Sequence, residues 1–225
     1  MIRYAGFALI TMSILAMVVL TPRVANGAEL RLGILGGGNS TVYAGDTPPK
    51  GSFKSQRSHQ FGGVVDVVLS PTVVLSGQVM SMTRTPVIEI EIDKENPDLN
   101  ELIEIETRYI VVPLMVQYVF GEKTTRFYLT VGGEVSWLQS ATLREEGLPE
   151  EDITDRMNSM DAAVDLGAGV RSKIGPVHWF IELRYTYGMV DLAEENITIG
   201  GKDLEVWKSR SSQLLIGLTI PVLGS

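Results

Sequence analysis

A strict alternation of apolar and polar residues, with a period of two, dominates the chain after residue 28. It is clearest in residues 127–137, 161–171 and 177–187, where every second side chain is mainly apolar and the intervening ones are mostly small, polar or charged. Because successive side chains of a β-strand point to opposite faces, this pattern predicts strands with one apolar and one polar face. No stretch of helical periodicity is long enough to compete with it, so the chain is expected to be all-β.

Five further segments alternate less strictly and bring the expected number of strands to eight. The eight segments are residues 29–37, 58–69, 73–84, 108–120, 127–137, 161–171, 177–187 and 210–222. Each has roughly the 9 to 11 residues that a tilted strand needs to cross a bilayer, which is longer than the usual strand of a soluble sheet. We therefore expect an eight-stranded antiparallel up-and-down transmembrane β-barrel.

The connections between these segments alternate between short and long. The short ones carry residues that favour chain reversal and span residues 70–72, 121–125 and 175–176. The long ones are mostly polar or acidic and span residues 39–57, 85–107, 139–160 and 188–209. Bacterial outer-membrane barrels have short periplasmic turns and longer outer loops, so we expect the long connections to lie outside the cell.

The N-terminal segment is typical of a secretory signal peptide. Arg3 precedes an apolar run over residues 4–20, and Pro22 and the small residues 25–28 then supply a helix stop and a cleavage site. The alternative is an uncleaved membrane anchor, because the apolar run is long for a signal peptide. We expect residues 1–28 to form the signal peptide and residues 29–225 to form one barrel domain in the bacterial outer membrane.

Composition excludes several classes of function. With 19 basic and 27 acidic residues the net charge is −8, and loss of Arg3 and Arg23 with the signal peptide makes it two units more negative. This charge argues against nucleic acid as a partner. The chain has no cysteine, which excludes disulfides and thiolate metal sites, and we expect no cofactor.

Aromatic residues are expected to gather near both ends of the apolar strand faces. Rings that carry a polar atom prefer the headgroup region of a bilayer, so two such bands are typical of a lipid-facing surface. The alternative, aromatic packing in a sandwich core, would place them toward strand centres. The expected aromatic girdles comprise Tyr118, Phe120, Phe127 and Trp179 at the short-turn end, and Phe61, Trp137, Tyr185 and Tyr187 at the long-loop end.

If the apolar faces meet lipid, the polar faces line the lumen of the barrel. An eight-stranded barrel is just wide enough for its own side chains to fill, so opposite charges there are expected to pair and to close the lumen. With residues 175–176 as a two-residue turn, Arg171 lies diagonal to Glu182, and Asp165 lies diagonal to Arg184. The expected lumen charge network comprises Arg31, Asp66, Glu134, Asp165, Arg171, Glu182 and Arg184.

The same carboxylates and arginines allow a second interpretation, an acid/base site for hydrolysis. The only two histidines, His59 and His178, are predicted at opposite ends of the barrel, so no dyad joins them. His59 near the outer rim is where a lipid-modifying enzyme would keep its base, but a single rim histidine is more often ordinary surface. We therefore predict no catalytic residues and no enzyme activity.

One predicted outer loop is strongly acidic. Residues 87–106 carry eight acidic side chains against Lys94 alone. Carboxylates in this number can bind calcium, but the order of an EF-hand loop is absent, which favours a solvated, self-repelling loop. The alternation in residues 87–92 also predicts that the flanking strands extend beyond the membrane as a hairpin.

Four short blocks share a pattern with a known family. Residues 108–118 place a proline between aliphatic residues ahead of a tyrosine, and residues 128–133, 167–169 and 182–185 follow as Tyr-Leu-Thr-Val-Gly-Gly, Gly-Ala-Gly and Glu-Leu-Arg-Tyr. In this order the blocks resemble PorT-like outer-membrane β-barrel proteins over about the second half of the chain. Val111 departs from that family, which often carries a glutamate there. The resemblance implies an outer-membrane barrel with variable outer loops and implies no reaction.

These observations favour a small outer-membrane barrel with a structural or surface-interaction role. Its expected partners are outer-membrane lipids, the barrel-assembly machinery during biogenesis, and an extracellular partner that contacts the acidic loops. The alternatives are a narrow pore or a transport or secretion accessory barrel, a lipid-modifying enzyme, and a soluble exported β-sandwich or lipocalin-like carrier whose apolar faces are buried.

Overall fold

The computed structural model describes residues 28–45, 51–90, 101–121, 124–145, 148–192, 197–199, 202–204 and 207–224. The predicted signal peptide, apart from its last residue, lies outside the described residues, as does the acidic segment 91–100. Within the described part of the chain, no helix is long and apolar enough to cross a membrane.

The described chain is almost entirely β-structure. Ten strands form one antiparallel sheet: β1 (Glu29–Gly45), β2 (Gly51–Ser70), β3 (Val73–Arg84), β4 (Pro86–Ile90), β5 (Glu101–Phe120), β6 (Thr125–Glu145), β7 (Glu151–Asp152), β8 (Met160–Ile174), β9 (Val177–Gly188) and β12 (Trp207–Leu223). A separate hairpin comprises β10 (Ile197–Ile199) and β11 (Lys202–Leu204), and a short 3₁₀ helix covers Thr154–Arg156.

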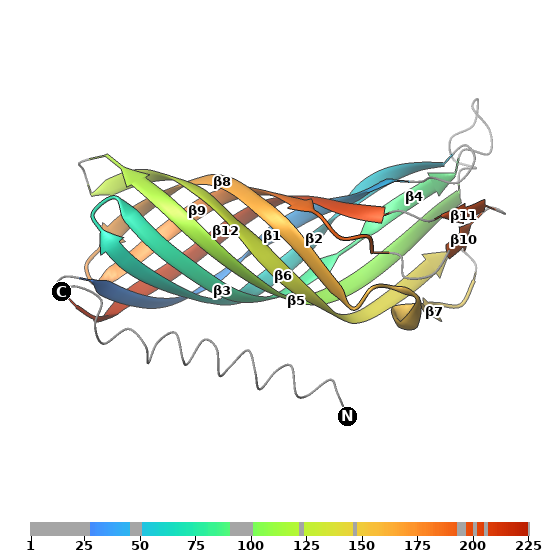
Figure 1. Ribbon diagram of the computed structural model, residues 1–225, viewed down its shortest axis with the longest axis horizontal. Coiled ribbons are helices and arrows are strands. Elements are labelled where there is room, and N and C mark those ends of the chain that lie inside the picture. The colour runs from blue at the N-terminus through green and yellow to red at the C-terminus, as the bar shows by residue number, and fades with distance from the viewer. Residues whose placement is uncertain are drawn as a thin grey trace.

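Eight of the ten strands close into a ring. Each strand pairs with the next in the order β1, β2, β3, β5, β6, β8, β9 and β12, and β12 then pairs with β1. Strand β4 pairs with both β2 and β5 beyond the end of β3, and β7 adds to the edge of β6. The predicted all-β antiparallel barrel is therefore confirmed, and the two strands beyond the expected eight lie at one end of it (Figure 1).

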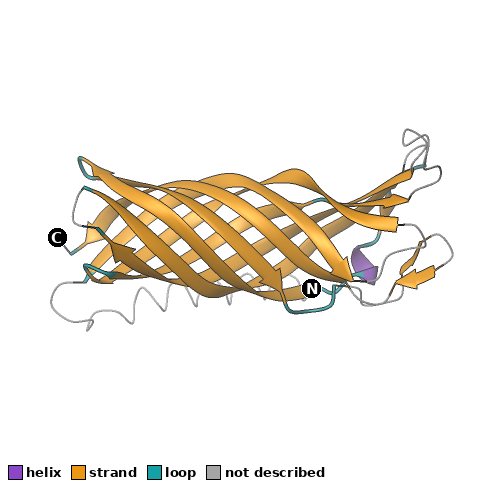
Figure 2. Ribbon diagram, turned by 90° about the horizontal axis from the view of Figure 1, so that it is seen from above, coloured by secondary structure: helices purple, strands orange, loops and turns teal. Residues whose placement is uncertain are grey.

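The short turns and the C-terminus of the barrel lie at the same end (Figure 1). Pro71 and Thr72 connect β2 to β3, and Gly175 and Pro176 connect β8 to β9 as a two-residue turn between paired neighbours. Gly175 has a φ of +60°, which glycine adopts without steric cost. The strands run obliquely to the barrel axis, as closure of a sheet requires (Figure 2).

Much of what the sequence predicted as long loops is strand. Residues 39–45, 51–57, 101–107 and 138–145 continue β1, β2, β5 and β6 past their predicted ends. The predicted hairpin extension at residues 87–92 is present in part, because β4 pairs with residues 101–104 of β5. These segments become strands because each finds a paired neighbour, which satisfies backbone groups whatever the polarity of the side chains.

The two faces of the ring strands differ as the alternation predicts. On β9, Ile181, Leu183 and Tyr185 are exposed on the outer surface, whereas Glu182 and Arg184 between them are buried inside. The same division holds on β8 and on the membrane-spanning half of β6. An outer surface of exposed aliphatic side chains is what a strand presents to lipid.

Candidate functional site

The interior of the barrel holds three zones that follow one another along its axis. An apolar cluster lies at the end opposite the short turns, beyond the ends of β3 and β8. Buried charged side chains occupy the middle of the barrel. The short-turn end opens into a cavity. The interior is therefore the candidate site, because most of the buried charged and polar side chains of the described chain gather there.

The outer apolar cluster lies inside the strand extensions. Its buried members are Tyr43, Ile88, Ile103, Ile105, Ala141, Ile153, Met157, Leu192 and Trp207. The rings of Tyr43 and Trp207 stack with centroids 5.5 Å apart, and Phe53 meets the Trp207 ring edge-on at 6.1 Å. Such ring pairs are stabilising beyond the area they bury, so packed apolar side chains occupy the interior at the end opposite the short turns.

Arg84, at the end of β3, is the centre of a buried ion cluster. Its side chain is fully buried, and its guanidinium donates to Asp161 Oδ2 at 2.9 Å and to Glu134 Oε1 at 3.0 Å. Ser209 Oγ donates to the same Asp161 oxygen at 3.1 Å. The guanidinium also stacks over the Tyr109 ring, 4.6 Å from its centroid. One arginine thus holds two buried carboxylates from β6 and β8, and we call this the Arg84 cluster.

A second ion cluster centres on Arg184 of β9. Arg184 pairs with Glu182 on its own strand, with 2.6 Å between Nη2 and Oε1, and it donates to Gln78 Oε1 at 3.1 Å across the lumen. Tyr128 donates its hydroxyl to the other Glu182 oxygen at 2.9 Å. Both oxygens of the buried Glu182 carboxylate therefore accept hydrogen bonds, and we call this the Arg184 cluster.

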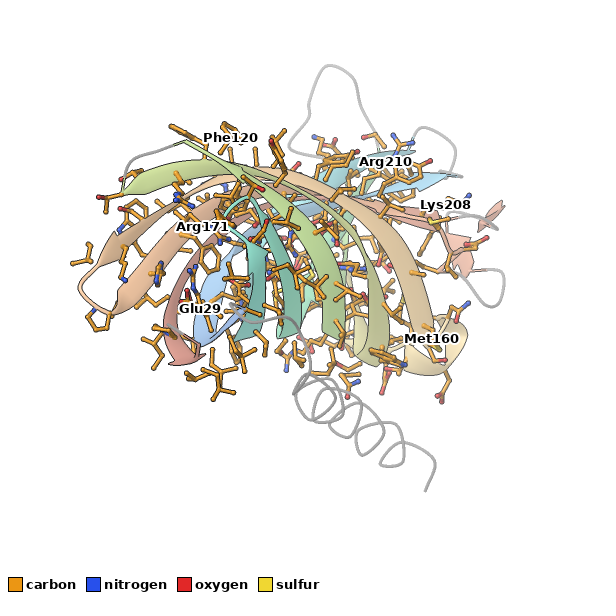
Figure 3. The ribbon with its side chains drawn as sticks, turned by 60° about the vertical axis from the view of Figure 1, so that its left-hand side comes forward. Glu29, Phe120, Met160, Arg171, Lys208 and Arg210 are labelled. Atoms are coloured by element: carbon orange, nitrogen blue, oxygen red, sulfur yellow. The ribbon has the colours of Figure 1, made fainter. Side chains whose placement is uncertain are left out.

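Arg171 connects the Arg184 cluster to the short-turn end. Its guanidinium stacks over the Tyr128 ring, 4.7 Å from the centroid, donates to Gln117, and lies 4.0 Å from Asp66 Oδ2. Its side chain lies inside the ring of strands, whereas Phe120 projects from the outer surface (Figure 3).

The structure places the predicted lumen residues inside the barrel but pairs them differently. The register sets Arg171 diagonal to Glu182 and Asp165 diagonal to Arg184, as predicted. Arg171 nevertheless contacts Gln117 and Asp66 across the lumen, and Thr186 donates to Asp165. Long arginine side chains reach over the narrow lumen, so distance along one hairpin does not decide their partners.

Arg31 lies apart from these clusters, at the short-turn mouth. It forms a two-point pair with Glu29, with 2.8 Å between Nε and Oε1 and 3.2 Å between Nη2 and Oε2. The predicted lumen charge network is therefore divided into two ion clusters and a separate pair at the mouth.

The lumen is also less polar than predicted. The inward faces of β2, β3 and β5 carry a buried apolar surface that faces the charges of β6, β8 and β9. Its members from those three strands are Val64, Val74, Met80, Met82, Tyr109, Val111 and Val119. These apolar side chains share the inward faces with buried polar ones, among them Asp66, Gln78 and Gln117, so apolar packing and polar contacts together fill the interior.

Sequence reasoning missed Arg84, Asp161 and Tyr128 as members of the ion clusters. The sequence did not indicate that Arg84 points inward, because Met80 and Met82 on the same face of β3 interrupt the alternation of apolar and polar residues. Asp161 and Tyr128 both stand on predicted polar faces, so their inward direction could be derived from the sequence. Their partners could not be derived, because those come from distant strands.

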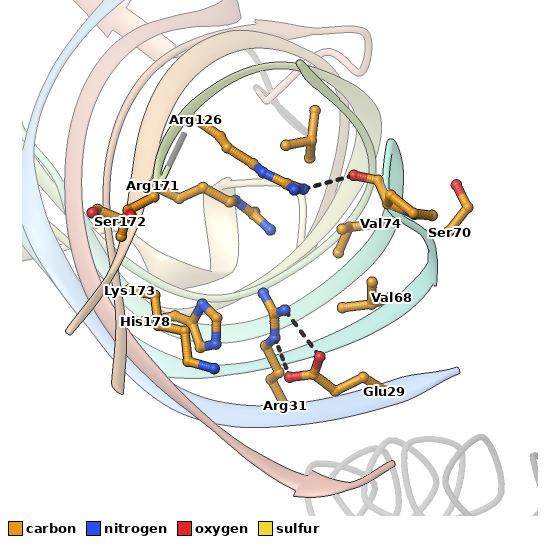
Figure 4. A pocket seen from close by; sticks show the side chains of 13 residues that line it. Glu29, Arg31, Val68, Ser70, Val74, Arg126, Arg171, Ser172, Lys173 and His178 are labelled. Carbon is orange, nitrogen blue, oxygen red and sulfur yellow. Dashed lines mark hydrogen bonds and ion pairs between the residues drawn. The ribbon is translucent and has the colours of Figure 1, made fainter. Parts of the chain in front are cut away.

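The cavity at the short-turn mouth has a volume of about 480 Å³ and is strongly basic. Its charged lining residues are Glu29, Arg31, Arg126, Arg171 and Lys173, and His178 joins them (Figure 4). His178 is partly buried in this lining and lies opposite Lys173 of β8.

The predicted aromatic residues lie on the outer surface of the barrel. Tyr118, Phe120 and Phe127 stack in a row at the short-turn end, with centroids 6.4 and 6.1 Å apart. The remaining exposed or partly exposed members are Phe61, Trp137, Trp179, Tyr185 and Tyr187. The predicted rim histidine, His59, is exposed on β2 opposite Gly38.

The strand extensions carry ion pairs beyond the outer aromatic band. The Glu106 carboxylate accepts hydrogen bonds from Arg108 Nη2 at 3.0 Å and from Arg144 Nη1 at 2.8 Å. Arg144 also donates a hydrogen bond to Glu150 at 2.9 Å. Partial burial opposes ionisation, but the hydrogen bonds from both arginines and the positive charge of Arg144 outweigh it and lower the pKa of Glu106. Among the described residues, no group of three acidic or histidine side chains has the arrangement of a metal site.

This lowered pKa predicts a pH-dependent contribution to stability. Because the folded pKa lies below the ordinary value of 4.5, the contribution is complete above pH 4.5 and is lost as the pH falls through the lowered value. Glu106→Gln is expected to unfold at lower urea concentration than the unsubstituted protein at pH 7 and at the same concentration near pH 2. A difference that persists unchanged at low pH would show that the substitution acts through packing.

The comparisons with known proteins agree on the fold. The profile of the outer membrane protein beta-barrel domain family matches residues 23–194. The structure is similar to OprG, an outer membrane protein of Pseudomonas aeruginosa, with 9% identity, a TM-score of 0.54, and coverage of 88% of this chain and 96% of that one. No sequence among the curated proteins matches.

A further structural neighbour is Neisserial surface protein A, with 10% identity, a TM-score of 0.47, and coverage of 85% of this chain and 97% of that one. At these identities the likeness extends to the fold alone. The family match covers most of the chain and coincides with a closed ring of strands whose outer surface is apolar. The protein therefore belongs to the outer membrane protein beta-barrel domain family and is a small β-barrel protein of the bacterial outer membrane.

Proposed function

We propose that the protein is a closed structural barrel that anchors a rigid surface extension outside the cell. The observation that carries this proposal is the filled interior: the Arg84 cluster, the Arg184 cluster and the outer apolar cluster lie one beyond another along the axis. Three successive layers of packed side chains leave no route of aqueous width through a barrel of eight strands.

The orientation follows from the connections. Outer-membrane barrels place short turns in the periplasm, so the extensions of β1, β2, β5 and β6 lie on the outer side. Ion pairs such as Lys54 with Glu89 and Arg144 with Glu106 cover the outside of the extension, and the outer apolar cluster holds it rigid from within. The extension therefore suits a role in which its acidic outer end contacts an extracellular partner.

The resemblance to PorT-like barrels is part of this proposal. The four blocks that carry the resemblance lie on β5, β6, β8 and β9, which are consecutive neighbours in the ring. Shared residues on adjacent strands support a common way of building one wall of the barrel, and they support a structural role more than a reaction.

A narrow pore or transport accessory is the second candidate. Several buried polar atoms in the lumen lack a hydrogen-bond partner, among them Asp66 Oδ1, Asp165 Oδ2 and Arg171 Nε. Buried polar groups of this kind are commonly satisfied by water, and two of the three lie toward the mouth cavity. Water that enters from the mouth would have to pass both ion clusters to cross.

Planar-bilayer recording separates the two functions. The refolded protein, checked by its shift in gel mobility on boiling, is expected to show no steady conductance steps. A general porin reconstituted in the same bilayer is the positive control. Steady steps that recur in independent preparations would contradict the closed barrel and support the pore.

A lipid-modifying activity is the remaining alternative and is tested at His59. We expect lipid A and phospholipids to keep the same masses whether cells carry the protein, the His59→Ala variant or neither. A mass change that needs the protein and disappears with His59→Ala would overturn the assignment of a non-enzymatic role.

A further inference from the structure

The mouth cavity concentrates positive charge in a protein that is acidic as a whole. Among its described lining residues are Arg31, Arg126, Arg171 and Lys173, with Glu29 as the acidic counterpart. The net charge of the chain is −8, so a cavity that gathers four basic side chains around one carboxylate departs sharply from the average surface. Clefts lined by one sign of charge attract ligands of the opposite sign.

The cations of the cavity differ in how far they are neutralised. Glu29 engages Arg31 through two hydrogen bonds and so compensates that charge. Arg126 donates to the main-chain oxygen of Pro71 at 3.0 Å, which positions the guanidinium without neutralising it. Lys173 is exposed at the end of β8, opposite His178 on β9. Figure 4 shows these side chains around a common opening, so Arg126 and Lys173, neither of which forms a close ion pair with another described residue, face one space.

Arg171 supplies an independent sign that the cavity takes a ligand. Its residue is more than nine-tenths buried, and its Nε has no hydrogen-bond partner. A buried cation with an unpaired donor is destabilising, and an anion bound against the Arg171 guanidinium offsets that cost. Its nearest carboxylate, Asp66, lies 4.0 Å away and leaves the guanidinium incompletely paired.

We propose that the mouth cavity binds a phosphate group through Arg126, Arg171 and Lys173. A phosphate presents several strong acceptor oxygens, which suit the planar forks of two arginines and the ammonium of a lysine. His178 lies on the wall of the same cavity and offers a ring nitrogen to the ligand. The volume of about 480 Å³ exceeds what inorganic phosphate fills, so the ligand is a phosphate ester that enters from the periplasmic side.

Calorimetric titration of the refolded protein tests this site. Inorganic phosphate and glycerol 3-phosphate are titrated in uncharged detergent, with chloride at matched ionic strength as the reference. We expect saturable binding of both phosphates and none of chloride. Arg126→Gln and Lys173→Gln are each expected to raise Kd about tenfold, which corresponds to about 1.4 kcal/mol, because each removes a charged hydrogen-bond donor to the phosphate.

Arg210→Gln is the matched control, because it removes one positive charge at the opposite end of the barrel, where Arg210 stacks on Tyr187. It is expected to leave Kd unchanged, and a gel-mobility shift on boiling verifies folding of each variant. The proposal is overturned if Arg210→Gln raises Kd for phosphate as much as Arg126→Gln and Lys173→Gln do, or if the unsubstituted protein shows no saturable binding of phosphate.

Nanodiscs separate the two sources of a phosphate group. If phosphatidylglycerol in the bilayer competes with soluble phosphate, the site takes a lipid headgroup. If binding is the same in uncharged and anionic bilayers, the ligand is a soluble ester. Loss of binding in both kinds of bilayer counts against the site. Bilayer conductance does not enter any of these readouts, so the closed-barrel proposal stands or falls separately.

Discussion

Replacement of Arg84 by methionine is expected to destabilise the folded barrel by about 3–5 kcal/mol, because it leaves two buried carboxylates without their common cation. Arg84 is fully buried and holds both Glu134 and Asp161 within 3.0 Å. The methionine side chain occupies most of the space of the arginine side chain without its charge, so the loss of packed volume contributes little to the destabilisation. Urea unfolding of the refolded protein in lipid vesicles, followed by tryptophan fluorescence and gel mobility, measures the change.

Two further variants show whether charge is the cause. Adding Glu134→Gln and Asp161→Asn to Arg84→Met removes the stranded charges and is expected to recover most of the lost stability. Arg108→Met is the exposed control, since its side chain is 64% exposed in its pair with Glu106 and its loss is expected to cost less than about 1 kcal/mol. An Arg84→Met variant as stable as this control would refute the importance of the Arg84 cluster.

Replacement of Gly62 by valine is expected to prevent most of the protein from folding. A Cβ atom at Gly62 would lie 2.1 Å from the main-chain oxygen of Val79 and 2.7 Å from Met80 Cα. Backbone atoms cannot move aside as the end of a side chain can, so β2 and β3 would have to separate at the pairing of Gly62 with Met80. Even modest overpacking costs roughly 1–3 kcal/mol, and a valine at this contact exceeds it.

The neighbouring Gly63 is the matched control. Its added Cβ would meet nothing closer than the Gly33 oxygen at 3.8 Å, and valine is favoured in strands. Gly63→Val is therefore expected to refold as well as the unsubstituted protein. The fraction of refolded protein that changes mobility on boiling measures both variants, and equal refolding of Gly62→Val and Gly63→Val would contradict the steric argument.

The ring of strands was predictable because its signal is local. In residues 177–187 every inward or outward direction follows from position alone, and the turn at Gly175 and Pro176 sets the register of the next strand. The strand extensions were missed for the opposite reason. Residues 39–45 and 51–57 are polar or small on much of both faces, so they resemble loops until a paired neighbour is known.

For the candidate site, the sequence predicted only which side chains point into the barrel. The sequence places Asp165, Glu182 and Arg184 on the inner face, and the structure has them there. Their partners depend on strands far apart in the chain, such as β3 for Arg84 and β5 for Gln117. No spacing within one segment carries that information.

The sequence by itself determined an all-β barrel with an apolar outer surface, because period-two alternation and turn residues act over a few neighbouring positions. Only the tertiary structure decided how the interior is arranged: which arginine meets which carboxylate, that apolar side chains cluster at the end opposite the short turns, and that the basic residues of the mouth meet in one cavity. Closure of the ring pairs residues as far apart in the chain as Leu30 and Leu223, and a local sequence pattern cannot show contacts at that separation.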